Sequence, residues 1–363
     1  MKKIRCHSFK RKIHLAIGFA ILLICMTDTM IASSKRQTKS RTMKNTDSIK
    51  LTHQYITVNG IKYHYAEAGK GPLVILLHGF PELWYSWRQQ LSALAQAGYH
   101  AVAPDLRGFG ESEVTTDERD YSLIQHARDV KALIDHIGAD KVVIVGHDWG
   151  ANLMWTMAQL YPNTVSAVVA LSIPFYPEPR DPAMIRKKWS SVFTNFEKKG
   201  IVETEFEKNP ERFFKLFFYA LSGDAPDGTI EKLYLKTTPN DRLMTSFPPT
   251  DHLPAWLSKE DLDYYVNAYK KTGITGALGF YRNTDEDYPK LKKIYKRGIT
   301  QPVLFIGGAK EAAIKFGSTE QMKNSLPNLR KVILLENCGH WVQQERAQEV
   351  NNALIEFLKQ EIK

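Results

Sequence analysis

The stretch Gly146-His147-Asp148-Trp149-Gly150 decides how this sequence folds. It follows an apolar run, Val142 to Val145, and precedes apolar residues at helical spacing through Leu160. A buried strand, a tight turn flanked by glycines and a helix are the context of a nucleophile elbow. The residue at the centre of such a turn is usually a serine, but here it is an aspartate. A carboxylate suits displacement at a saturated carbon, which gives an alkyl ester that water then hydrolyses.

Strands and helices are predicted to alternate on both sides of this turn. Two alternating runs around Asn59-Gly60 predict a β-hairpin. A helix is expected to begin at Ser122 and to end at Gly138. Apolar runs predict buried strands at 73–77, 100–103, 165–171, 303–306 and 332–335. This alternation is typical of an α/β protein with a mostly parallel, doubly wound sheet.

The alternation stops between residues 176 and 296, where the sequence is rich in aromatic residues and is predicted to be helical. A helical insertion within one α/β domain describes a cap, or lid, over an active site. The predicted organisation is therefore a first part of the core at 51–175, a helical cap at 176–296 and a second part of the core at 297–363. We expect most of the cap aromatics to form its core.

The N-terminal segment has the features of an export signal. Basic residues precede an apolar stretch from Leu15 to Met26, which is short for a membrane span of ~20 residues. Residues 1–34 are predicted to be a signal peptide cleaved near Ala32, or alternatively an uncleaved N-terminal anchor. Residues 35–50 form a polar linker. A secreted or periplasmic location is expected, with membrane contact only if the segment stays attached.

The net charge of +10 comes from this N-terminal part. Residues 1–50 hold 12 Lys and Arg against two acidic residues, and the rest of the chain holds 37 of each sign. A nucleic-acid-binding domain carries its basic excess on the folded body, so no nucleic-acid partner is expected. Cys338 is the single cysteine after residue 50, which excludes a disulfide within that part and a cysteine zinc site. We expect no cofactor and no metal.

Further motifs follow the predicted strands. They are His78-Gly79-Phe80-Pro81, continued by Glu82 to Arg88, then the stretch 104–112, Tyr281-Arg282-Asn283 and Cys338-Gly339-His340-Trp341. Together with the elbow, these motifs resemble the epoxide hydrolases of the α/β-hydrolase fold, including secreted bacterial members. The resemblance covers residues 54–360. It implies the α/β-hydrolase fold and the hydrolysis of a small, hydrophobic epoxide, a reaction at an ether bond.

The resemblance also assigns the catalytic residues. Asp148 would be the nucleophile, and His340 would activate the water that hydrolyses its ester. An acid is needed to fix the tautomer of this base, and Glu311 follows the strand at 303–306 where the family places it. Some relatives carry the acid after the strand that follows the elbow, but the matching residue here is Ser172. The backbone N–H groups of Phe80 and Trp149 would form the oxyanion hole.

Opening an epoxide needs hydrogen-bond donors on its oxygen, and the family commonly uses two tyrosines of the cap. Tyr281 matches one of them. The other position falls on Val192, which has no donor, so Trp189, Thr194 or Tyr219 are alternatives. The walls of the substrate pocket are predicted to include His78, Pro81, Trp84, Val192 and Trp341.

Other functions share parts of this pattern. Haloalkane dehalogenases have the same nucleophile but usually an asparagine in place of Phe80. Fluoroacetate dehalogenases have an arginine in place of Trp149. A non-catalytic α/β-hydrolase that binds a ligand would not need both Asp148 and His340. The sequence therefore favours hydrolysis of an epoxide to a vicinal diol, and it leaves a homo-oligomer open.

Overall fold

The computed structural model describes residues 49–188, 192–234, 242–315 and 318–362. The predicted signal peptide and nearly all of the predicted linker lie outside these residues. The described chain contains an eight-stranded sheet in the order β1-β2-β4-β3-β5-β6-β7-β8. The strands are β1 Thr52–Val58, β2 Ile61–Ala68, β3 Leu73–Leu77, β4 His100–Pro104, β5 Val142–His147, β6 Val165–Leu171, β7 Val303–Gly308 and β8 Leu329–Leu335. Strand β2 pairs antiparallel with β1 and β4, and all other pairs are parallel.

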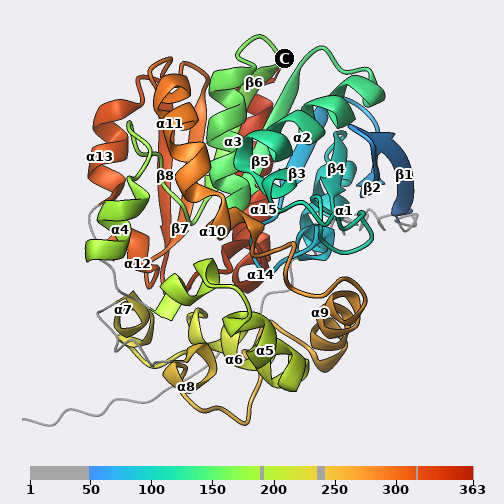
Figure 1. Ribbon diagram of the computed structural model, residues 1–363. Coiled ribbons are helices and arrows are strands. Elements are labelled where there is room, and N and C mark those ends of the chain that lie inside the picture. The colour runs from blue at the N-terminus through green and yellow to red at the C-terminus, as the bar shows by residue number, and fades with distance from the viewer. Residues whose placement is uncertain (1–48, 189–191, 235–241, 316–317, 363) are drawn as a thin grey trace, which may run out of the picture. The chain divides into compact units, whose positions relative to one another are not determined.

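The central strands β3 and β5 are buried along their whole length because helices cover both faces of the sheet (Figure 1). In β3, Ile75 and Leu77 pack in one core with helices α2 (Leu123–Ile137) and α3 (Trp149–Leu160). Val74 and Leu76 pack in a second core with α1 (Arg88–Gln96) and α15 (Ala347–Glu361). The α/β-hydrolase fold is confirmed.

Local signals in the sequence set the ends of several elements. The Ser122 side chain accepts a hydrogen bond from the Gln125 N–H and caps α2, which ends at Gly138 in the left-handed conformation. Asn59 and Gly60 both have positive φ angles, 47° and 83°, as a tight hairpin turn requires. These predicted boundaries are confirmed.

The cap consists of helices between β6 and β7. Its elements are α4 Pro182–Lys188, the 3-10 helix η3 Val192–Glu197, α5 Ile201–Lys208, α6 Pro210–Ala220, α7 Thr229–Tyr234, α8 Leu243–Ser246, α9 Lys259–Thr272 and α10 Gly279–Arg282. Figure 1 shows α5 to α9 grouped at one end of the sheet. The predicted aromatic core is present, since Phe213, Phe214, Phe217, Phe218 and Tyr269 are buried.

Helix α11 (Thr284–Tyr295), the last part of the predicted cap, packs against the core. Its Tyr295 ring stacks on Phe175 at 5.9 Å, and Phe175 contacts Trp155 of α3. The remaining helices belong to loops or edges of the core: η1 Trp84–Trp87, η2 Glu118–Tyr121, α12 Ala312–Lys315, α13 Ser318–Ser325 and α14 Val342–Glu345. None of the helices in the described ranges is long and apolar enough to cross a membrane.

Candidate active site

Asp148 sits on a sharp turn between β5 and α3. Its φ of 53° is rare for a residue with a side chain and marks a strained position. Glycines permit the turn, because a Cβ on Gly150 would lie 2.1 Å from the Leu77 carbonyl oxygen. A Cβ on Gly79 would lie 2.3 Å from the Asp148 Oδ1 atom. The absence of these side chains brings the loop after β3 against the carboxylate, where the Phe80 N–H donates to Oδ1 at 2.9 Å.

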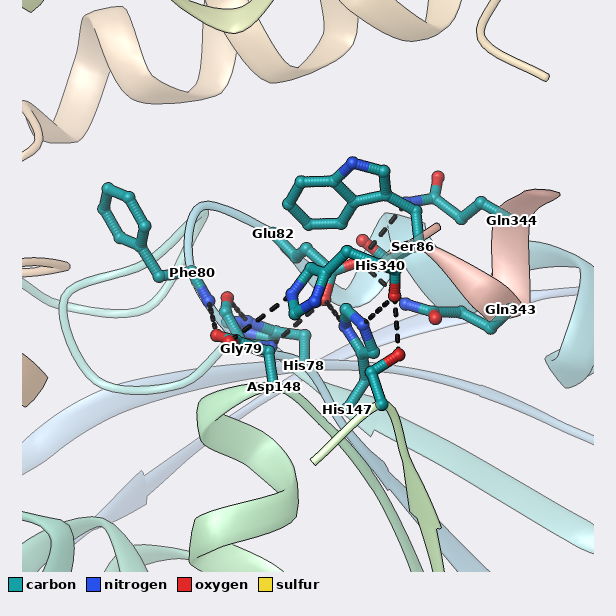
Figure 2. Close-up of polar contacts among 12 residues, drawn as sticks. His78, Gly79, Phe80, Glu82, Ser86, His147, Asp148, His340, Gln343 and Gln344 are labelled. Carbon is teal, nitrogen blue, oxygen red and sulfur yellow. Dashed lines mark hydrogen bonds and ion pairs between the residues drawn. The ribbon is translucent and has the colours of Figure 1, made fainter. Parts of the chain in front are cut away.

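The structure brings His340 and Glu311 to this carboxylate (Figure 2 shows His340 beside Asp148). The Nε2 atom of His340 lies 3.4 Å from Asp148 Oδ2, and its Nδ1 lies 2.5 Å from Glu311 Oε2. The three residues follow three parallel strands, β5, β7 and β8, whose carboxyl ends meet at one edge of the sheet. From the end of β7, the side chain of Glu311 is long enough to reach the His340 ring.

The charges of the three residues are coupled. Burial disfavours the ionised form of Asp148, but the hydrogen bond and charge of His340 and the Phe80 N–H outweigh it and lower the pKa of Asp148. Burial likewise disfavours charged His340, yet Glu311 and Asp148 raise the pKa of His340 well above its usual value. Asp148 and Glu311 thus both favour the charged form of His340 in the resting site. When Asp148 becomes an ester, it loses its negative charge and no longer raises the pKa of His340.

The oxyanion positions are where the sequence predicts them. Phe80 N–H already bonds one Asp148 oxygen, and Trp149 is the first residue of α3. The first N–H groups of a helix have no acceptor within the helix, so the Trp149 amide points its dipole toward the elbow. A negative oxygen on Asp148 is stabilised at this place.

A second, buried Glu–His pair supports the base from behind, and the sequence analysis missed it. Glu82 Oε2 lies 2.5 Å from His147 Nδ1, and His147 Nε2 donates to the His340 carbonyl oxygen at 2.7 Å (Figure 2). Ser172 Oγ donates to the same carbonyl oxygen at 2.7 Å. Because a carbonyl oxygen can only accept, His147 Nε2 carries a hydrogen, and its Nδ1 shares a short hydrogen bond with Glu82.

Glu82 is fully buried, and its other oxygen accepts hydrogen bonds from Gln343 and Gln344. Burial acts to raise its pKa, but the charges of His147 and His78 and the Gly79 N–H lower it. One carboxylate thus joins the loop after β3, the elbow and the loop that carries His340. The sequence held one indication of this pair: Glu82 and His147 both lie in motifs described above, four residues after His78 and one residue before Asp148.

Tyr281 belongs to the single-turn helix α10 and stands at the wall of the site. Its ring contacts Phe80 at 5.5 Å, Trp149 at 5.1 Å and Phe196 of the cap at 4.7 Å. It is thus held between the two residues whose amides face Asp148, and its side chain is partly exposed.

The position of the second predicted donor is only partly described. The side chain of Val192 and all of Trp189 lie outside the described residues. Thr194, in η3, and Tyr219, in α6, are both half-buried. The identity of the second donor stays a prediction.

The predicted pocket walls are placed as follows. Trp341 is buried, with its ring edge-on to the His340 ring at 4.7 Å and its Nε1 donating to the Phe218 carbonyl. Pro81 is buried after a cis peptide bond from Phe80. Trp341 therefore lies beside His340, and its role as a pocket wall stays a prediction.

His78 and Trp84 are placed differently from the prediction. His78 is fully buried, and its ring nitrogens bond the Gly79 carbonyl and the Leu106 N–H, so it holds two loops together. The Trp84 ring is buried and donates to the Tyr264 hydroxyl of α9 at 2.7 Å. It fastens the cap to the core. A motif shows where a residue lies along the loop but not which way its side chain turns.

Within the described residues, no group of three or more His, Cys, Asp or Glu side chains could hold a metal ion. The residues of the site offer a carboxylate, a histidine with an acid partner, backbone amide donors and one phenol.

Comparisons with known proteins agree with this geometry. The model of the alpha/beta hydrolase fold family matches residues 72–347. Epoxide hydrolase A of Mycobacterium tuberculosis is 36% identical over 85% of this chain and 97% of its own length. Bifunctional epoxide hydrolase 2 of Mus musculus is 35% identical, and the chain spans 56% of that protein's length. The solved structure of an epoxide hydrolase from an endophytic Streptomyces aligns with a TM-score of 0.80 and 38% identity, covering 85% of this chain and 95% of that one. The chain belongs to the alpha/beta hydrolase fold family, in the branch whose members are named epoxide hydrolases.

We predict that Glu82→Gln lowers the free energy of unfolding by about 3 kcal/mol at neutral pH, because it breaks a buried ion pair. The folded-state pKa of Glu82 is below its ordinary 4.5, so its stabilisation is present above that pH and is lost on acidification through the folded pKa. The difference between the two proteins should therefore shrink in acid. Urea unfolding at several pH values measures it.

Glu67→Gln provides a matched control, because Glu67 pairs with His100 at the same kind of distance, 2.7 Å, but is part-exposed. We expect it to cost less than 1 kcal/mol. Equal losses in the two variants would show that the buried pair has no special role in stability.

Proposed function

We propose that this protein hydrolyses epoxides to vicinal diols in two steps through an ester on Asp148. The observation that carries the proposal is the carboxylate at the elbow with one oxygen in an amide hole and the other facing a His–Glu pair. The names of its relatives support the same reaction.

In the first step, one oxygen of Asp148 attacks an epoxide carbon. Oδ1 is bound by the Phe80 N–H, so Oδ2 is the oxygen free to form the new bond. The carbon–oxygen bond of the epoxide breaks, and its oxygen takes the developing negative charge. The Tyr281 hydroxyl gives its proton to that oxygen, and the phenolate regains a proton through solvent from His340, which becomes neutral once Asp148 is an uncharged ester.

In the second step, water attacks the ester carbonyl carbon. Neutral His340 accepts the proton, and Glu311 stabilises the histidinium that forms. Oδ1 becomes the oxyanion; it already accepts from the Phe80 N–H, and we expect the Trp149 N–H to be its second donor. The alcohol leaves as part of the diol, and the oxygen of the water remains in the Asp148 carboxylate.

The walls of the site favour an apolar substrate. Phe80 packs against Phe196 and Phe217 of the cap and against Tyr281. These rings offer one hydroxyl among apolar surfaces, which suits a small, hydrophobic epoxide.

Dehalogenation of an alkyl halide is the second candidate, because Trp149 is the residue that would face a leaving halide. Phe80, whose ring has no donor, speaks against it.

Substitution of His340 by Gln is expected to trap the intermediate. Step one needs no base, whereas step two does, so the ester on Asp148 accumulates. Intact-mass and peptide mass spectrometry with a panel of aryl and alkyl epoxides would detect an adduct equal to the epoxide mass on the peptide that contains Asp148. A panel of turnover substrates that leaves no adduct would contradict the mechanism. An Asp148→Asn, His340→Gln protein is the control that should stay unmodified.

Tyr281→Phe distinguishes the two candidate reactions. It removes only the hydroxyl that assists the epoxide oxygen, so alkylation by epoxides should slow by about 100-fold. Alkylation by alkyl halides needs no acid on an oxygen and should change little. The rates are measured as adduct formation in the His340→Gln background, and equal effects on both substrate classes would refute this role of Tyr281.

We also propose that residues 1–34 direct the protein to a secreted or periplasmic location. The basic start and the apolar stretch from Leu15 to Met26 support this proposal. N-terminal sequencing of the exported protein should find a mature end close to Ala32. A full-length protein in the membrane fraction would indicate an anchor instead.

A further inference from the structure

Three rings stack in line behind the active site. The Trp149 ring lies parallel to Phe280 with centroids 5.2 Å apart and 6° between the planes. The opposite partner in the stack is His126 of α2, 4.4 Å from the Phe280 ring at 26°. His126 and Phe280 are both buried, whereas Trp149 is partly exposed. The stack therefore runs from the interior of the core to the wall of the site.

His126 is an unusual residue for the buried end of this stack. It is 0% exposed, and neither ring nitrogen has a hydrogen-bond partner among the described residues. Burial first, and then the charges of Arg107 and His78, lower its pKa to about 3, so the ring is neutral at physiological pH. A buried polar atom without a partner destabilises a fold. A residue kept at such a cost is a candidate for a functional role.

The middle ring of the stack is joined directly to the proposed acid. Phe280 precedes Tyr281 in α10, a helix of four residues. A single turn has little stability of its own, so the packing of its side chains sets its position. The Tyr281 ring meets the Trp149 ring edge-on at 5.1 Å. The rings of Phe280 and Tyr281, which are neighbours in the chain, therefore both contact the same indole.

We propose that His126 is a positioning residue for the alkylation step: its ring closes the stack His126–Phe280–Trp149 and thereby fixes Tyr281 beside Trp149, the residue next to Asp148. The inference rests on the proposed function, because it concerns the placement of the acid. It requires the ring of His126 but not its nitrogens. Small displacements of a reacting group cost large factors in rate, so loosening the stack should be visible in the chemical step.

The test compares His126→Ala and His126→Phe, each in the His340→Gln background, where alkylation of Asp148 by an epoxide is the readout. His126→Ala removes the ring, and alkylation should slow about tenfold or more. His126→Phe keeps a ring and removes two unpaired nitrogens. It should alkylate within about threefold of the parent, and its Tm should rise by roughly 2–4 °C.

Leu133→Ala is the matched control, since Leu133 is fully buried on the same helix two turns away. It should destabilise the fold like His126→Ala while leaving alkylation within about twofold. In otherwise wild-type protein, His126→Ala should also leave the hydrolysis rate of the ester within about twofold in single-turnover experiments, because the stack holds the Trp149 ring, whereas the Trp149 N–H is held by the backbone of α3 and His340 and Glu311 lie on other loops. If His126 only stabilised the fold, His126→Ala would affect alkylation and ester hydrolysis alike.

Two results would overturn the inference: an effect of His126→Ala on alkylation no larger than that of Leu133→Ala, or equal slowing by His126→Ala and His126→Phe. A crystal structure of His126→Ala with Phe280 and Tyr281 unmoved would do the same without any activity measurement. Failure of the parent His340→Gln protein to form an adduct would instead reject the proposed function.

Discussion

The close approach of helix α3 to the end of strand β3 is the constraint on which the site depends. Gly150 permits it, because any side chain there would overlap the Leu77 carbonyl group. The approach places the loop that begins at His78 directly over the elbow, and the Phe80 N–H then reaches the Asp148 carboxylate. The positive φ of Asp148 is maintained by this packing, since an isolated turn would relax. The nucleophile and its amide donor are thus positioned by the same backbone contact.

His340 is held at both of its polar ends by glutamates. Glu311 binds the ring directly, and Glu82 acts through His147 on the carbonyl group of the same residue. Glu311 and Glu82 have different effects on His340. The first sets the tautomer and the pKa of the base, whereas the second fixes the loop on which the base is mounted. Burying two Glu–His pairs so close together is costly unless every hydrogen-bond position is filled, and the bonds from Gln343 and Gln344 fill those of Glu82.

The sequence was sufficient for the fold because its signals are local. Apolar runs such as Val142–Val145 fixed the buried strands, and Ser122 and Gly138 marked a helix that the structure has at those residues. The elbow motif predicted the nucleophile, and the resemblance to epoxide hydrolases assigned His340 and Glu311 as the base and the acid. The Glu82–His147 contact was not predicted, because it joins residues 65 positions apart and because glutamate is rarely buried. The orientations of His78 and Trp84 depend on neighbours from distant loops, which no local pattern reveals.

Helix α10 is counted with the cap in the sequence but is fastened to the core. The Asn283 side chain donates to the Glu118 carbonyl group, and Gly279 lies against Tyr121, so that no larger residue fits there. Arg282 of the same helix bonds Glu203 of α5, so Tyr281, the proposed donor, is tied to the core as well as to the cap. Substitutions in the cap helices α6 to α9 are then expected to change which molecules fit with less effect on the position of Tyr281. Substrate selectivity and reactivity can then change separately, so that related enzymes can accept different substrates and still carry out the same reaction.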